Sequence, residues 1–317
     1  MITTSIKEAA SKLNENELVA IPTETVYGLA ANAYSEKAIR KIFDLKKRPL
    51  KNPLIVHIKA LEEIDAIATE IPEAARKLAQ IFWPGPLTLV LKKRPEISNL
   101  ITAGNDTVAI RMPNHKVALE LLNTLNFPIV APSANPFKSI SPTTAQHVET
   151  YFEKENLTVL EGGACTFGIE STIIGFEGNR AIVYRLGSIP LEKIKGAIGE
   201  LESSLNNDKK PNAPGMMNKH YAPQKKMVIT TNLSNEIALN KHLKIGILAY
   251  TQPILNQNVI YQEVLSNVGC TEEAAANLYA SLHRIDKSAC DIIIAEKLPE
   301  YQFGMSVNDR LKRAASA

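Results

Sequence analysis

The chain has 317 residues, of which 45% are hydrophobic and 22% charged, so it is long enough for two domains and excludes wholesale disorder. Its formal net charge of +3 excludes the strong basic excess of a dedicated nucleic-acid-binding domain, although not a transient RNA partner. Three widely spaced cysteines without a CxxC pair argue against a disulfide framework or structural zinc site, and no apolar run reaches membrane-spanning length. We therefore expect a reduced, soluble, cytoplasmic protein.

The first 200 residues predict helices and strands in mixed order. Apolar spacing predicts a helix over 4–15, then a strand over 18–21, and Ser35 is expected to cap a helix that continues to Phe43. Further strands are expected at 54–58, 87–91, 107–112, 128–131, 171–176 and 181–185, and further helices at 72–83, 117–125, 143–152 and 190–200. Several strands follow one another directly, which indicates a twisted α/β sheet of mixed direction and not a regular βαβ repeat.

A polar segment with two prolines, SSLNNDKKPNAPG at 203–215, predicts a domain boundary. We expect a first domain at 1–203, an interdomain linker at 204–225 and a smaller domain at 226–317. In the last part, strands at 226–231, 244–249, 258–263 and 291–295 and a helix from Ala274 to Ile285 predict a Rossmann-like α/β fold.

Six polar segments of the first domain lie at strand ends, where open α/β sheets bind ligands. They are PTETVYGL (22–29), DLKKRPLKNPLIVHI (44–58), TVAIRMP (107–113), APSANPFKSISPTT (131–144), GGACTFGIESTI (162–173) and YRLG (184–187). The basic loop at 46–51 could bind phosphates or be an ordinary solvated surface, and Arg111 could bind a carboxylate or form a surface ion pair. His57 lies among apolar residues, which is more typical of a core histidine than of a catalyst.

The glycine-rich segment at 162–173 matches neither the P-loop nor the dinucleotide-binding spacing. It also lacks the GxSxG pattern of a serine nucleophile, as does the loop at 131–144. The residues themselves therefore predict a protein that binds an anionic small molecule such as a nucleotide, and they do not define its reaction.

Together with WPGPLTLVL (83–91), these segments occur in the order found in the YrdC-like family, which the chain resembles along its whole first domain. PGMMNKHYAP (214–223) resembles the linker of the family's long form, which adds a C-terminal Rossmann-like domain. The resemblance implies a twisted α/β sheet with a concave, basic cavity and L-threonylcarbamoyladenylate synthase activity. Such enzymes join L-threonine, bicarbonate or CO₂ and ATP and release pyrophosphate, and a separate complex then transfers the threonylcarbamoyl group to tRNA.

The resemblance also assigns roles to individual positions. Lys46 and Arg48 would act on the phosphates, with Mg²⁺ brought by ATP and no metal ligand from the protein. L-Threonine would be bound by Thr25, His57, Arg111, Ala131 and Ser171, and ATP by Arg48, Asn52, Thr107, Ser133, Ser141, Arg185 and Tyr221. A carbamate formed from the threonine amine and CO₂ would attack the α-phosphorus of ATP, under a linker that Tyr221 places over the active site.

The sequence departs from the common family pattern at Pro136-Phe137-Lys138 and at Met217-Asn218-Lys219. One alternative function is a non-catalytic RNA- or ribosome-binding protein of the same fold, with phosphate contacts from 46–51 and 92–94. The near-neutral charge and the presence of every threonine and ATP position argue against it. A second alternative, a carbamoyl transferase of hydrogenase maturation, would require acylphosphatase and zinc-finger segments that this sequence lacks.

Overall fold

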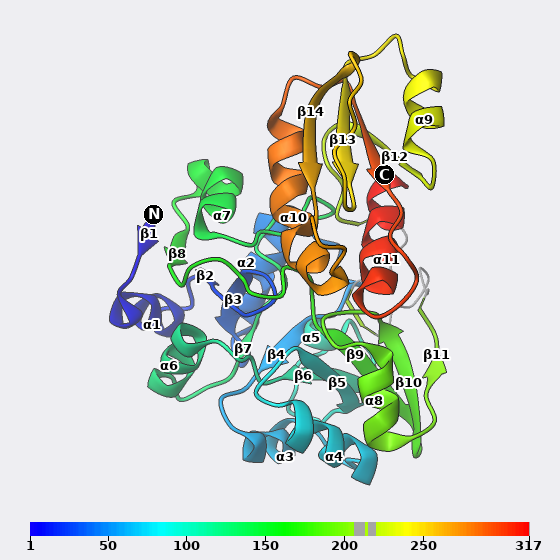
Figure 1. The fold of residues 1–317 in the computed structure, drawn as a ribbon. Coiled ribbons are helices and arrows are strands. Elements are labelled where there is room, and N and C mark those ends of the chain that lie inside the picture. The colour runs from blue at the N-terminus through cyan, green and yellow to red at the C-terminus, as the bar shows by residue number, and fades with distance from the viewer. Residues whose placement is uncertain (206–212, 215–219, 317) are drawn as a thin grey trace. The chain divides into compact units, whose positions relative to one another are not determined.

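The computed structural model describes residues 1–205, 213–214 and 220–316 (Figure 1). The described residues divide into two compact units. Unit 1 contains residues 1–137, 142–166, 170–205 and 213–214, and unit 2 contains 138–141, 167–169 and 220–316. Two short loops from the first 203 residues therefore group with the C-terminal part of the chain. Much of the predicted linker, including Met217-Asn218-Lys219, lies outside the described residues.

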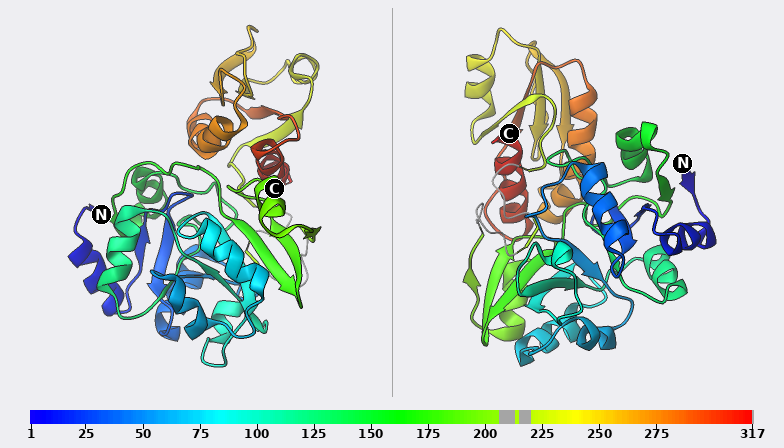
Figure 2. Two further views of the ribbon diagram at one scale, coloured as in Figure 1. Left: turned by 60° about the horizontal axis from the view of Figure 1, so that its bottom comes forward. Right: turned by 180° about the vertical axis from the view of Figure 1, so that it is seen from behind.

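Unit 1 is built on an 11-stranded sheet that combines parallel and antiparallel pairs, which confirms the predicted mixed direction. Its twist can be followed in Figures 1 and 2. In spatial order the strands are β1 (Ile2–Thr3), β8 (Thr158–Leu160), β2 (Val19–Ile21), β3 (Gly28–Asn32), β7 (Ile129–Val130), β4 (Ile55–His57), β6 (Thr107–Arg111), β5 (Leu87–Lys92), β9 (Thr172–Glu177), β10 (Arg180–Arg185) and β11 (Glu202–Ser203).

The helices expected in the first domain are all present. Ser35 caps α2 because its hydroxyl accepts a hydrogen bond from the Ala38 amide at 3.2 Å. The helices of unit 1 are α1 (Ile6–Asn14), α2 (Glu36–Lys46), α3 (Ile64–Ile67), α4 (Glu73–Phe82), α5 (Asn99–Thr102), α6 (Lys116–Thr124), α7 (Ala145–Phe152) and α8 (Leu191–Ile198), with 3₁₀ turns η1 (Leu61–Glu63) and η2 (Glu153–Glu155).

Strand β3 of the sheet was not predicted from the sequence. The segment PTETVYGL leads directly into this strand. The strand sequence GLAAN is buried on both faces except at its last position, so it lacks the alternation that identifies a strand.

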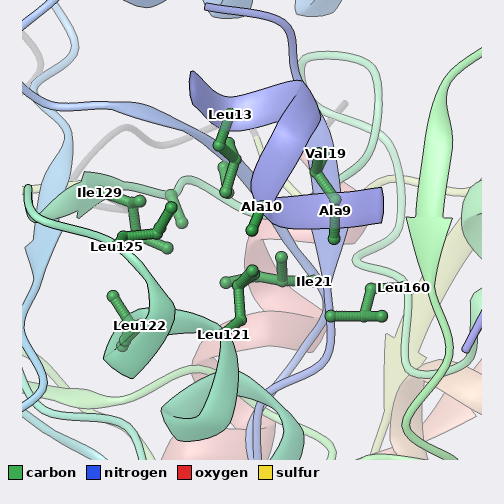
Figure 3. Close-up of a cluster of buried hydrophobic side chains, with 12 residues drawn as sticks. Ala9, Ala10, Leu13, Val19, Ile21, Leu121, Leu122, Leu125, Ile129 and Leu160 are labelled. Carbon is green, nitrogen blue, oxygen red and sulfur yellow. The ribbon is translucent and has the colours of Figure 1, made fainter. Parts of the chain in front are cut away.

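A hydrophobic cluster fixes the start of the 22–27 loop (Figure 3). Leu13 of α1, Ile21 of β2 and Leu121 of α6 are fully buried within it, beside Ile129 of β7 and Leu160 of β8. Burial of each such side chain contributes roughly 1.5–3 kcal/mol. Because Ile21 is the last residue of β2, this core holds the point from which the 22–27 loop emerges.

Unit 2 contains a four-stranded parallel sheet, which confirms the predicted Rossmann-like α/β domain. In spatial order its strands are β12 (Lys226–Thr230), β15 (Ile292–Glu296), β13 (Ile245–Ala249) and β14 (Val259–Val264), and its helices are α9 (Leu233–Leu239), α10 (Thr271–Lys287) and α11 (Phe303–Ala315). Ile237 of α9 packs on Ile247, whereas Gly246 approaches Ile285 of α10, so these helices cover opposite faces. No helix in the described part of the chain is both long and apolar enough to cross a membrane.

Candidate active site

Three of the proposed ligand positions lie on one face of the unit 1 sheet. Strands β4 and β6 pair in parallel, with Ile55 opposite Ala109 and His57 opposite Arg111. Thr107 precedes Ala109 by two residues, so it shares their face. At about 3.3 Å per residue, Thr107 and Arg111 lie roughly 13 Å apart along β6. The polar positions therefore occupy both ends of one strand.

An apolar floor separates these polar ends. It consists of Ile55, Val90, Ala109, Ile173, Ile182 and Tyr184 on the strands, together with Ala213. Ala213 belongs to the predicted linker and is fully buried. At this point, therefore, the linker covers the sheet face that carries His57 and Arg111.

Arg111 forms a buried ion pair with Glu24 of the 22–27 loop, at 2.8 Å between Nη2 and Oε1. Their side chains are 5% and 4% exposed, so the pair lies in the interior and is not the surface ion pair considered from sequence. Neither Glu24 oxygen, nor Nε or Nη2 of Arg111, makes a geometrically acceptable hydrogen bond within the described residues. The two opposite charges thus retain unused donors and acceptors.

A hydroxyl network shapes the loop beside this pair. The Thr23 hydroxyl accepts hydrogen bonds from the amides of Thr25 and Val26, each at 3.2 Å, and lies 2.9 Å from the Thr25 hydroxyl. Such local bonds are the usual reason for threonine in a tight turn. Thr25 is consequently held fully buried directly after Glu24.

His57 is buried at the end of β4, with Nδ1 3.1 Å from the Ile55 carbonyl oxygen. Burial, and secondly the positive charge of Arg111, lower the pKa of His57 to about 3. The imidazole is therefore neutral at physiological pH. If Nδ1 carries the proton and donates to Ile55, Nε2 is left as a hydrogen-bond acceptor.

The side chain of Lys46, the last residue of α2, is 1% exposed and is not part of a solvated surface. Its Nζ donates to the carbonyl oxygens of Ser133 and Asn135, each at 2.5 Å. Burial, and secondly the charge of Arg48, hold the pKa of Lys46 well below its ordinary value. This contact ties the basic loop to the 131–137 loop, so Lys46 and Ser133 lie together.

Arg48 is also buried, and its guanidinium donates from Nε to the Asn52 carbonyl at 3.2 Å and from Nη2 to the Pro53 carbonyl at 2.8 Å. These bonds fold the 48–53 segment around the guanidinium, and Asn52 is fully buried. Lys47 and Lys51 of the same segment are exposed. The basic loop therefore divides into two buried and two solvated cations, which the run of charges in the sequence could not distinguish.

Arg185 and Ser171 are held together at the ends of adjacent strands. The guanidinium donates to the Ser171 carbonyl from Nε at 3.0 Å and from Nη2 at 2.9 Å, and also reaches the Ser171 hydroxyl. The hydroxyls of Ser171 and Thr88 are 2.7 Å apart. At Gly187, a Cβ atom would lie 2.3 Å from the carbonyl carbon of Ser171, so only glycine permits this approach. This contact gives a physical reason for the YRLG motif.

The glycine-rich segment packs on the 22–27 loop. A Cβ atom at Gly162 would lie 2.4 Å from Cγ of Pro22, and the Thr166 hydroxyl donates to the Glu24 carbonyl at 3.3 Å. Cys165 of the same segment is buried, and burial raises the pKa of its thiol to about 12. The segment therefore contacts the 22–27 loop at Pro22 and at the backbone of Glu24.

Unit 1 contains every proposed site residue except Ser141 and Tyr221, which belong to unit 2. Ala131 is tied to β4 by its amide, which donates to the Ile55 carbonyl at 3.1 Å. In unit 2, the Ser141 carbonyl lies 3.2 Å from Nε2 of His283, and the Tyr221 ring lies 5.7 Å from that of Tyr279.

Two residues of this constellation were not selected as site residues from the sequence. Glu24 lies in a quoted motif, but nothing in the sequence shows that it pairs with Arg111. Thr88 lies in a strand that looks wholly structural, although alternation places it on the face of Val90 and opposite Ile173. The alternation of side chains along β5 is the signal that could have identified Thr88 as a site residue.

Comparisons with known proteins agree with this architecture. The model of the Sua5, YciO and YrdC proteins, described as "Telomere recombination", matches residues 11–187, and "Threonylcarbamoyl-AMP synthase, C-terminal domain" matches 189–316. The threonylcarbamoyl-AMP synthase of Pyrococcus abyssi is 39% identical over 98% of this chain and 94% of its own, and that of Bacillus subtilis is 38% identical over 98% and 92%. The crystal structure of P. abyssi Sua5 complexed with L-threonine matches with a TM-score of 0.91 at 38% identity, over 98% of this chain and 94% of that one.

Proposed function

Because the chain belongs to the Sua5/YrdC family of threonylcarbamoyl-AMP synthases, we propose that it converts L-threonine, bicarbonate or CO₂ and ATP into threonylcarbamoyl-AMP and pyrophosphate. It is a nucleotidyltransferase-type enzyme of tRNA modification. The observation that carries the proposal is the buried Arg111, whose guanidinium keeps unused donors beside His57 and Thr25. The relatives extend over the whole chain, which favours this enzyme over a non-catalytic RNA-binding protein.

We assign the threonine subsite to Thr25, His57, Arg111, Ala131 and Ser171. The Arg111 guanidinium binds the threonine carboxylate, since a planar pair of donors suits a carboxylate. Nε2 of neutral His57 is available to accept a hydrogen bond from the substrate. Ser171, which Arg185 and Thr88 hold in place, closes the subsite on the β9 side.

We assign the nucleotide subsite to Arg48, Asn52, Thr107, Ser133, Ser141, Arg185 and Tyr221. Lys46 and Arg48 stabilise negative charge on the phosphates and on the departing pyrophosphate. The threonine and nucleotide subsites meet at the contact between Ser171 and Arg185, so the carbamate and the α-phosphorus are brought together there.

The enzyme class uses ATP, and we propose that Mg²⁺ enters with it. Within the described residues, no group of three or more His, Cys, Asp or Glu side chains could hold a metal ion. The phosphates would therefore supply most of the ion's ligands, and the ion would neutralise their charge.

The remaining proposals concern the surroundings of the reaction. We propose that residues 1–203 form the catalytic domain, 204–225 the linker and 226–317 the C-terminal domain. Burial of Ala213 supports a linker that excludes water from the labile carbamate. A separate complex would transfer the threonylcarbamoyl group to tRNA in the cytoplasm.

The test is direct synthesis. Purified protein is incubated with ATP, Mg²⁺, bicarbonate and labelled L-threonine, and threonylcarbamoyl-AMP and pyrophosphate are measured. We expect both products in equal amounts, each dependent on threonine. Absence of product, together with intact RNA binding, would contradict the enzymatic function and support the alternative.

A further inference from the structure

Glu24 is a buried carboxylate whose hydrogen-bonding capacity is unused. It is 3% exposed, and neither Oε1 nor Oε2 accepts a hydrogen bond from any described residue. Its close neighbour Arg111 leaves Nε and Nη2 equally unused. Buried polar groups that make no hydrogen bond are costly, so an ion pair whose two members make none is expected where a ligand completes it.

The unused groups match an α-amino acid in charge. The guanidinium donors suit a ligand carboxylate, and the Glu24 acceptors suit an ammonium group two bonds away from that carboxylate carbon. A zwitterionic ligand would thus complete both members of the ion pair, whereas a simple carboxylate would complete only Arg111.

The reaction proposed above also requires that the threonine ammonium lose a proton. An α-amino group with a pKa of about 8 or above is mostly protonated at pH 7, and an ammonium has no lone pair with which to attack carbon. The other titratable groups of the proposed site are poorly suited to take the proton. The pKa of His57 is lowered to about 3, and Cys165, with its pKa raised to about 12, already holds a proton. Lys46 directs its Nζ donors at the carbonyls of the 131–137 loop.

We propose that Glu24 is a catalytic residue that binds the ammonium of L-threonine and removes its first proton, an inference that rests on the proposed function. One N–H bond breaks and its proton moves to Oε2 of Glu24. The freed lone pair forms the N–C bond with CO₂, and a second proton leaves the nitrogen for water, which gives the carbamate. A carbamate oxygen then attacks the α-phosphorus, the bond to pyrophosphate breaks, and Glu24 returns its proton to water.

The test compares Glu24→Gln with the wild-type protein, and uses Glu70→Gln as a matched control. Glu70 also pairs with a cation, Lys92 at 2.5 Å, but is 69% exposed and distant in sequence from the site segments. Binding of L-threonine and of its des-amino analogue, 3-hydroxybutanoate, is measured by calorimetry. Pyrophosphate release at saturating threonine is measured between about pH 7 and about pH 9.

We expect Glu24→Gln to weaken threonine binding while 3-hydroxybutanoate binds as in the wild type. We expect the kcat of Glu24→Gln at pH 7 to fall about 100-fold relative to the wild type. This difference in kcat should become smaller as pH rises, because more of the threonine is then present as the free amine. If Glu24 only aligned Arg111, both ligands would bind more weakly to Glu24→Gln and the loss of kcat would not depend on pH. Either result would overturn the proposal.

One further result separates the role of Glu24 from the proposed function on which it rests. Failure of the wild-type protein to form threonylcarbamoyl-AMP would contradict the proposed function itself.

If thermal unfolding shows that Glu24→Gln does not fold, Glu24→Asp takes its place, because it keeps the carboxylate. We expect Glu24→Asp to retain the preference for L-threonine over 3-hydroxybutanoate, and loss of that preference would overturn the proposal.

Discussion

Replacement of Arg185 by alanine tests how the two subsites are joined. The guanidinium links the end of β10 to the residue that precedes β9 and, through Nη1, to the Pro214 carbonyl at 3.2 Å. Arg185→Ala removes these bonds and leaves the buried Ser171 carbonyl without the donors that Arg185 supplied. We therefore expect damage to both stability and substrate binding.

The size of the effect follows from the burial of Arg185, which is 6% exposed. Hydrogen bonds to charged groups contribute about 1.5–3 kcal/mol each, and an unsatisfied buried acceptor costs about 1–3 kcal/mol. Since bonds to one residue are not additive, we expect Arg185→Ala to lower the free energy of unfolding by about 3–5 kcal/mol. We also expect ATP to bind at least about tenfold more weakly, which corresponds to about 1.4 kcal/mol.

The matched control is Arg180→Ala, at the first position of the same strand. Arg180 is 63% exposed and pairs with Glu177 and Glu202 at 3.0 and 3.1 Å. Exposed pairs contribute about 0–1 kcal/mol, so this variant should unfold almost like the wild type. Urea titration gives the unfolding free energies, and calorimetry with a non-hydrolysable ATP analogue gives the affinities. Equal losses of stability in the two variants would refute the reasoning.

Three other perturbations give distinct outcomes. Arg111→Ala should abolish threonine binding while ATP binding persists, and equal loss of both by calorimetry would refute the subsite assignment. Gly187→Ala places a Cβ 2.3 Å from the Ser171 backbone, so it should lower stability by about 1–3 kcal/mol in urea titrations, and unchanged stability would argue against the close approach. Burial lowers the pKa of His283 to about 4 in the folded protein. Between pH 6.5 and pH 4 this histidine is therefore protonated in the unfolded chain but mostly neutral in the folded protein, so the free energy of unfolding falls as pH drops through this range. Between pH 7 and pH 5, the free energy of unfolding should fall by about 2 kcal/mol less in His283→Gln than in the wild-type protein. Equal pH dependence of the two proteins would contradict this prediction.

Much of the secondary structure follows from local sequence. Ser35 and the apolar spacing after it locate α2, and the alternation of TVAIRM locates β6. Elements without a periodic apolar pattern were missed. The helix α11 was missed because Asn308, Arg310 and Arg313 lie on its buried face, so polar letters interrupt the pattern that would reveal it.

The site was less predictable than the strands that carry it. Motif order selected Arg111, Arg185 and Ser171 as candidates, but their partners are set by tertiary contacts between distant segments. Glu24 meets Arg111 across 87 positions, and Thr88 meets Ser171 across 83. No local pattern encodes such contacts when a single sequence is considered, because the register between strands determines them.

The mixed direction of the sheet explains why the polar positions lie where they do. In an all-parallel sheet, the ligand groups would gather at the carboxyl ends of the strands. Here His57, Arg111 and Arg185 are the last residues of their strands, whereas Thr107 begins its strand. Strand β5 runs against β6, so Thr88 at the start of β5 comes level with Arg111 at the end of β6. A substrate as long as an aminoacyl nucleotide can therefore lie along one face of the sheet, with polar groups at its two ends and an apolar floor between them.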